Sequence, residues 1–224
     1  MDDGPTRPLS FLQLLLALVC PVAVIFLSRK VNLGIEKMIV MAILRSTGQL
    51  MFAGYILLAF IFEINSPFVV VLYLSAMIFI AAIEVTARQV RTYSGHLRDA
   101  ILAVFVGGGL IGAYGSIVVF RPSPWWQPKV LIPTAGMIIG NSISGPAISI
   151  DRLLSDVSEK THEVEVRLAF GATGLEAVSH SVKSAIVAAI MPLLNMMSVV
   201  GLVSIPGMMV GQLLGGAGPL AAAG

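Results

Sequence analysis

Charge-free apolar stretches separated by short polar connections dominate the chain. They run over residues 8–28, 46–62, 64–83, 100–120, 130–150 and 184–224. A helix needs about 20 apolar residues to cross a bilayer, so each of the first five stretches predicts one transmembrane helix. The sixth stretch is too long for one span and is interrupted by Pro206 and several glycines. It predicts a sixth helix over about 184–205, followed by a Gly-rich tail that is re-entrant or external.

The composition strengthens this interpretation. Hydrophobic residues make up 57% of the 224 residues and charged residues 12%, and the mean hydropathy is +0.93, far from the values of soluble globular domains. The sequence therefore predicts an all-α, polytopic transmembrane helical bundle that forms one transmembrane domain over 1–224 in the lipid bilayer. The formal net charge of +2 gives no reason to expect a nucleic-acid partner, and the single cysteine, Cys20, excludes an internal disulfide.

The positions of the basic residues predict the orientation, because Lys and Arg stay on the cytoplasmic side during insertion. Only Arg7, Arg121 and Lys129 fall on the side of the N-terminus. The leader MDDGPTR is not basic, so the first stretch is interpreted as an anchor rather than a cleaved signal peptide. The prediction is an outside N-terminus, in a bacterial inner membrane or a eukaryotic cell or organelle membrane. The other eleven basic residues follow the first, third and fifth stretches: Arg29, Lys30, Lys37, Arg45, Arg88, Arg91, Arg98, Arg152, Lys160, Arg167 and Lys183.

The connection over 151–183 is the only long polar segment, with six acidic and four basic residues. Residues 151–170 form an amphipathic pattern and predict one helix. Gly171 can adopt the positive φ that follows a helix end, and Thr173 with Glu176 fits a capping box for the next helix. The segment therefore predicts a cytoplasmic helix-turn-helix that docks a partner. A solvated loop between two spans is the alternative.

The stretch EVRLAFGAT, residues 165–173, resembles the cytoplasmic coupling motif of ABC transporter permeases. In that motif Glu-Ala-Ala is followed by a Gly six residues after the Glu, and Glu165 and Gly171 keep the spacing. Val166 and Arg167 replace the two alanines. The stretches PTAGMIIGNSISGPAISIDRLL and PLLNMMSVVGLVSIPGMMVGQLLGGAGPL look like the FetB-type iron-export permeases. The plant aluminium-tolerance membrane proteins are similar.

The resemblance implies an ABC permease subunit that pairs with itself and with a separate cytoplasmic ATPase, which binds the ATP and Mg. It implies export of metal ions such as iron, with a nucleotide sugar as the alternative cargo. Members of this family carry a seventh, C-terminal helix, which is expected to be missing here. The residues implied in ATPase coupling are Glu165, Arg167, Gly171, Ala172 and Thr173.

The lysines support a separate ATPase independently, because a P-loop needs a Gly-Lys pair and none of the five lysines follows a glycine. The chain is therefore predicted to be no enzyme. A secondary transporter or channel is the second class, although ion-coupled proteins of that class pair ionisable residues at membrane depth, and Arg45, Glu63 and Glu84 all lie near predicted helix ends. An intramembrane hydrolase is a third class, disfavoured because no histidine lies near the serines of GNSISGPAISI.

Polar side chains at membrane depth are candidates for the substrate pathway, because they are costly unless paired or facing water. Hydrogen bonding between helices is the alternative role. Methionine thioethers near the C-terminus are weaker candidates for metal binding, being soft ligands that favour Cu(I). The pathway candidates are Gln49, Asn141, Asn195, Ser198 and Gln212, and the methionines are Met196, Met197, Met208 and Met209.

Overall fold

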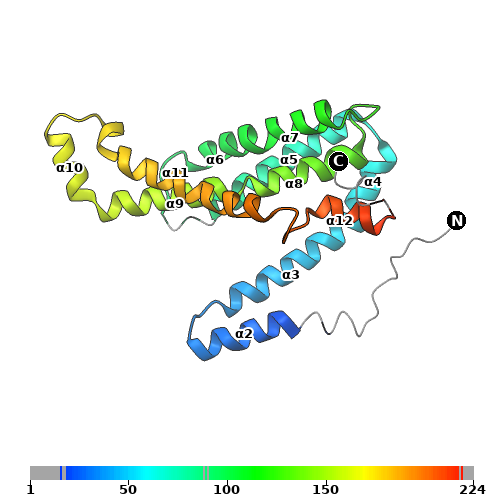
Figure 1. Cartoon of the computed structure of the whole chain (residues 1–224), viewed down its shortest axis with the longest axis horizontal. Coiled ribbons are helices and arrows are strands. Elements are labelled where there is room, and N and C mark those ends of the chain that lie inside the picture. Colours follow the sequence, from blue (N-terminus) through cyan, green and yellow to red (C-terminus); the bar gives the residue numbers. More distant parts are fainter. Residues whose placement is uncertain (1–15, 17–18, 88, 90, 217, 219–224) are drawn as a thin grey trace. The chain divides into compact units, whose positions relative to one another are not determined.

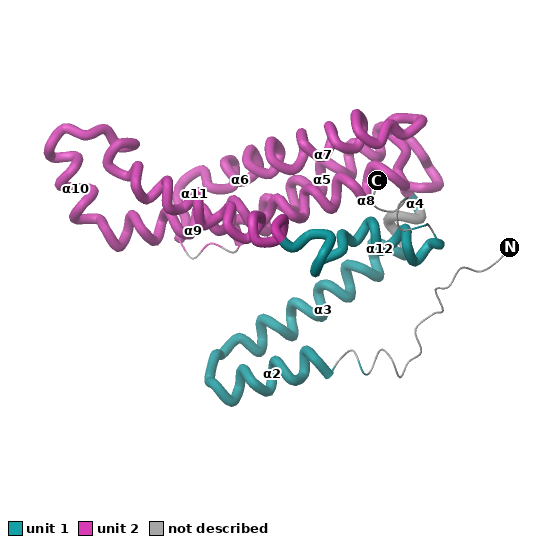
Figure 2. The backbone as a smooth tube through the Cα atoms, viewed as in Figure 1, with its two compact units in different colours: residues 1–60, 199–224 teal, residues 61–198 magenta. Residues whose placement is uncertain are grey.

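A computed structural model describes residues 16, 19–87, 89, 91–216 and 218. It divides into two compact units, residues 1–60 with 199–224 (unit 1) and residues 61–198 (unit 2), coloured separately in Figure 2. The elements of both units are helices, labelled in Figure 1. The described part of the chain contains one isolated bridge, Val200 to Ser204, and no named strand.

Unit 1 begins with a helical hairpin. Helix α2 spans Val19–Val31 and α3 spans Glu36–Phe52, and the turn between them holds Asn32 at φ 56° and Gly34 at φ 71°. The buried Ser28 hydroxyl donates to Glu36 Oε1 at 2.8 Å, which joins the end of one helix to the start of the next. Helix α3 continues through the π-helix η1 (Ala53–Leu57) into α4 (Leu58–Ile64), which crosses into unit 2, and α12 (Gly207–Leu214) belongs to unit 1.

Unit 2 is a bundle in which a long helical run packs against two neighbours. The run over 96–119 is built from α6 (His96–Val104), η2 (Phe105–Leu110), α7 (Ile111–Tyr114) and η3 (Gly115–Val119). It packs against α5 (Pro67–Ala87) and α8 (Pro128–Asn141). The remaining helices are α9 (Ser144–Glu159), α10 (Thr161–Ala169) and α11 (Gly174–Val199).

Small side chains allow the helices of unit 2 to approach closely, as is usual in membranes. Most of its main core cluster is alanine and valine, on α5, α6, α8 and α9. At Gly108, an added Cβ would lie 2.5 Å from Ser142 Oγ and 3.1 Å from Ile139 Cα. The packing of η2 on α8 therefore needs a glycine at this position.

Five helical runs among the described residues are long and apolar enough to cross a membrane, over 36–64, 67–87, 96–119, 128–159 and 174–199. The prediction of an all-α polytopic membrane protein is thus confirmed. Residues 8–15, 17 and 18 of the first predicted helix, 8–28, lie outside the described residues, and α2 covers its end. The short predicted connection after Glu63 is present, with Asn65 at φ 44° between α4 and α5.

Three predicted helix bounds are wrong. The single helix predicted over 151–170 is broken at Lys160 (φ −105°, ψ 26°), where the Thr161 hydroxyl donates back to the carbonyls of Val157 and Ser158, a contact that bends helices. The fifth helix is interrupted at 142–143, between α8 and α9. The last one ends at Val199 because the next residues form a tight turn, with Gly201 at φ 84°.

Candidate coupling site

The turn between α10 and α11, residues 170–173, has the geometry of a Schellman motif. Gly171 adopts φ +90°, as predicted, and its N–H donates to the Leu168 carbonyl at 3.0 Å. The Ala172 N–H donates to the Arg167 carbonyl at 3.1 Å. These two bonds are the pair that closes a helix through a left-handed residue. The turn is therefore a defined structure rather than an irregular loop.

The start of α11 forms the predicted capping box. The backbone N–H and the hydroxyl of Thr173 both donate to Glu176 Oε2, at 2.7 and 2.8 Å, and the Glu176 N–H donates to Thr173 Oγ1 at 3.4 Å. Reciprocal bonding of this kind satisfies N–H groups that the first turn of a helix leaves without partners. The end of α10 and the start of α11 are thus closed by local contacts on either side of Gly171.

Two large apolar side chains flank this turn and face solvent. Phe170 is 89% exposed and Leu175 is 81% exposed. The neighbouring helix α10 is polar, with Glu165 exposed and Arg167 paired to Glu163 at 2.6 Å. An exposed apolar pair on a polar, rigid projection is typical of a surface that a partner covers.

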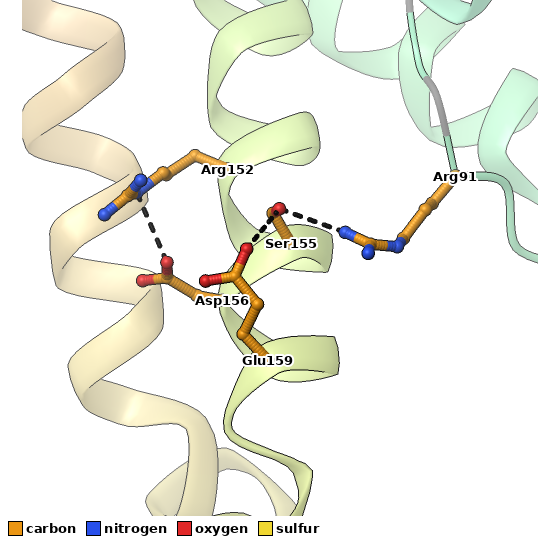
Figure 3. Close-up of polar contacts among 5 residues, drawn as sticks. All are labelled: Arg91, Arg152, Ser155, Asp156 and Glu159. Atoms are coloured by element: carbon orange, nitrogen blue, oxygen red, sulfur yellow. Dashed lines mark hydrogen bonds and ion pairs between the residues drawn. The ribbon is translucent and has the colours of Figure 1, made fainter.

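Polar contacts join α9 to the α5–α6 connection, residues 88–95 (Figure 3). Arg91 Nη1 donates to Ser155 Oγ at 3.0 Å, and Ser155 Oγ donates to Glu159 Oε1 at 3.1 Å. The Tyr93 hydroxyl of that connection donates to Asp99 Oδ2 of α6 at 2.9 Å. Partial burial, followed by the bond to the Asp99 carboxylate, raises the pKa of Tyr93. The connection is therefore tied both to α6 and to the helix that leads into α10.

Helix α9 also holds an ion pair that involves a buried carboxylate. Arg152 Nε lies 3.3 Å from Asp156 Oδ1, with the Arg152 side chain 54% exposed and that of Asp156 only 5% exposed. Asp156 Oδ2 is buried without a hydrogen-bond partner. The Asp156 carboxylate is thus buried, while its ion-pair partner Arg152 reaches solvent.

We expect Arg152→Ala to destabilise the protein by about 1–3 kcal/mol, because it removes the cation that pairs with the buried Asp156 carboxylate. Arg167→Ala, which removes an exposed helical pair with Glu163, should cost only about 0.3–0.5 kcal/mol. The measurement is thermal unfolding of the two purified variants in the same detergent. If Arg152→Ala and Arg167→Ala lose the same stability, the buried Asp156 carboxylate does not depend on its ion pair with Arg152.

The predicted pathway and methionine residues are distributed over both units. Asn141 is exposed at the end of α8, and the Ser198 hydroxyl donates to the Asn195 carbonyl of its own helix at 2.8 Å. The described residues hold no group of three or more His, Cys, Asp or Glu side chains suited to a metal ion. Unit 2 holds Asn141, Asn195, Ser198, Met196 and Met197, and unit 1 holds Gln49, Gln212, Met208 and Met209.

Sequence reasoning missed the most exposed members of the site, Phe170 and Leu175. The available signal was an apolar residue close to Gly171 on each side within an otherwise polar segment. Nothing in the sequence indicated the hydrogen bond from Arg91 to Ser155, because the two residues are 64 positions apart.

The membrane-length helices and the helical bundle define a polytopic α-helical membrane protein. The chain belongs to the uncharacterised protein family UPF0014, whose match covers residues 11–224.

Three similar relatives illustrate the range of this family. The UPF0014 membrane protein slr1647 of Synechocystis is 36% identical over 79% of this chain and 68% of its own length. Protein ALUMINUM SENSITIVE 3 of Arabidopsis thaliana is 32% identical over 92% of this chain and 74% of its own length. The probable iron export permease protein FetB of Escherichia coli is 31% identical over 94% of this chain and 79% of its own length. No solved structure matches the chain.

Proposed function

We propose that this chain is the membrane subunit of an ABC transporter that exports metal ions such as iron. The permease acts as a homodimer and is energised by a separate cytoplasmic ATPase, which binds the ATP and Mg. The turn between α10 and α11 docks that ATPase and transmits its motion to the membrane helices. The N-terminus then lies outside, and α9, α10 and the start of α11 project into the cytoplasm.

The observation that carries this proposal is the exposed apolar tip on a rigid turn. Phe170 and Leu175 flank a turn that is closed by a Schellman motif and a capping box. A docking element has to be preformed, since ordering a loop on binding costs free energy. Its central aromatic residue is of the type that dominates interface energetics. Both properties suit a small projection that inserts into a groove of a partner.

The hydrogen bond between α9 and the α5–α6 connection supports the proposed transmission of motion from the ATPase to the membrane helices. A force applied at the turn reaches α9 through α10, and Arg91 bonded to Ser155 passes it to the start of the 96–119 run. Motion of the docked tip is therefore shared by two membrane-length helical runs. Metal cargo is supported by the similarity to FetB, a probable iron export permease.

The test is coexpression of the chain with candidate ABC ATPases from the same organism. We expect the ATPase to copurify with the permease, and the metal content of cells expressing the pair to fall below that of cells expressing either subunit alone. If the ATPase copurifies but cellular metal is unchanged, the chain is still an ABC transporter subunit, and its cargo is an organic molecule rather than a metal ion. Transport by the permease without any ATPase would contradict the proposal in favour of a secondary transporter.

The topology makes a separate prediction. In a Cys20→Ser background, single cysteines at Ser94 and Glu159 should react with a membrane-impermeant thiol reagent only after the membrane is opened to the cytoplasm. A cysteine at Ser123 should react from outside in intact cells. The reason is the excess of Lys and Arg in the connections that contain Ser94 and Glu159. Labelling of Ser94→Cys and Ser123→Cys from the same side would refute this orientation.

A further inference from the structure

Unit 2 contains an apolar cavity between α5, the 96–119 run and α8. Its volume is about 140 Å³. The floor is formed by Leu131, Ala135 and Ile139, which are 3–4% exposed, so it lies inside the bundle. The rim is formed by Val71, Ile117 and Trp125, which are 38–48% exposed, so the cavity is bordered by residues at the bundle surface.

Two small residues on the 96–119 run create the space. Gly109 and Ala113 both line the cavity, and their spacing of four places them on one side of the run. A Cβ at Gly109 would lie 3.0 Å from Ile78 Cδ1, so this wall already touches α5 beside the cavity. Gly109 thus lets Ile78 of α5 pack against the run, and Ala113, one turn further along, is the small residue beside the remaining space.

The chemistry of the lining selects the occupant. Apart from the indole N–H of Trp125, the side chains that line the cavity carry no polar group, and a buried water needs two to four polar partners. Apolar cavities of about 150 Å³ stay dry and bind benzene-sized molecules. The space therefore suits a short length of hydrocarbon rather than water, an ion or a polar cargo.

The position of the rim identifies where the hydrocarbon comes from. Trp125 lies in the connection between η3 and α8, and Lys129, exposed in the first turn of α8, is two residues from the lining residue Leu131. Tryptophan and lysine are the side chains that occupy the headgroup level of a bilayer. The cavity thus opens close to one membrane interface, at the end of unit 2 that carries this connection.

We propose that this cavity is a binding site for one acyl chain of a phospholipid from the adjacent leaflet. The upper part of the chain fills the space between Val71 and Ala113 and reaches the floor at Ala135, while the headgroup stays at the level of Trp125 and Lys129. The bound chain completes the packing of α5, α7 and α8. This inference is independent of the cargo and of the ATPase.

The experiment uses Trp125 as the reporter, in a full-length Trp126→Phe background that leaves one tryptophan. The protein is reconstituted into nanodiscs of phosphatidylcholine brominated near the headgroup end of the acyl chain. Bromine quenches tryptophan on contact, so we expect strong quenching of Trp125. Filling the cavity with Ala113→Phe should abolish most of that quenching, because the added ring occupies the space of the chain.

The matched control is Val118→Phe, which adds a ring at an exposed position of the same run that does not line the cavity. Its quenching should equal that of the parent. If Ala113→Phe does not fold, Val71→Phe fills the cavity from the α5 side and should give the same loss. Equal quenching in a folded filled variant and in Val118→Phe would overturn the proposal, because the quenching would then come from lipid outside the cavity. A second outcome would also overturn it, in favour of a small free apolar ligand. In that outcome, filling the cavity removes quenching by free 1-bromohexane but leaves quenching by brominated lipid unchanged.

Discussion

Gly171→Val is expected to leave membrane insertion intact and to abolish copurification of the ATPase. Gly171 adopts φ +90°, where a residue with a Cβ costs about 1–2 kcal/mol, and valine is among the least tolerant because it is β-branched. No atom lies within 4 Å of the position of that Cβ, so the cost is conformational and not a clash with a neighbour. The turn then opens, and Phe170 and Leu175 lose their relative positions.

Two controls separate the conformation of Gly171 from the loss of a glycine as such. Gly171→Asn should retain docking, because asparagine tolerates the left-handed region. Gly174→Val makes the same exchange three residues away, where φ is not positive and the space is also open, and it should have a smaller effect. The readouts are ATPase copurification and stimulated hydrolysis. If the Gly171→Val permease binds and stimulates its ATPase like the parent, residues 170–173 are a solvated loop and not the docking site.

Phe170→Ala should weaken ATPase docking by about 2 kcal/mol or more, about 30-fold in Kd, as expected for a central aromatic anchor of an interface. The stability of the isolated permease should change by less than about 0.5 kcal/mol, because the 89% exposed ring buries almost nothing there. The measurements are a titration of purified ATPase onto permease nanodiscs and a thermal scan of the permease alone. The combination of lost docking and unchanged stability is what distinguishes an interface residue from a packing residue.

Phe68→Ala is the matched control, since it removes another strongly exposed phenylalanine, at the start of α5. It should leave docking unchanged. Leu175→Ala should weaken docking in the same direction as Phe170→Ala, because the two side chains flank one turn. Unaltered docking in the Phe170→Ala, Leu175→Ala double variant would mean that the ATPase contacts another part of the chain.

The sequence alone determined the features that depend on near neighbours. The membrane-length helices follow from the length of apolar runs, which the energy of burying peptide groups in lipid forces into helices. The positive φ of Gly171 and the bonds between Thr173 and Glu176 were also predicted, because turn and cap chemistry involves residues within a few positions of each other. These parts of the candidate site could be found without coordinates.

Only the tertiary structure decided which side chains meet across the bundle and which remain exposed. The bond from Arg91 to Ser155 and the apolar cavity beside Ala113 each join segments far apart in sequence. The helix break at Lys160 likewise overrides a continuous amphipathic pattern. The physical reason is that hydropathy and capping act along the chain, whereas packing and exposure depend on where distant helices lie in space.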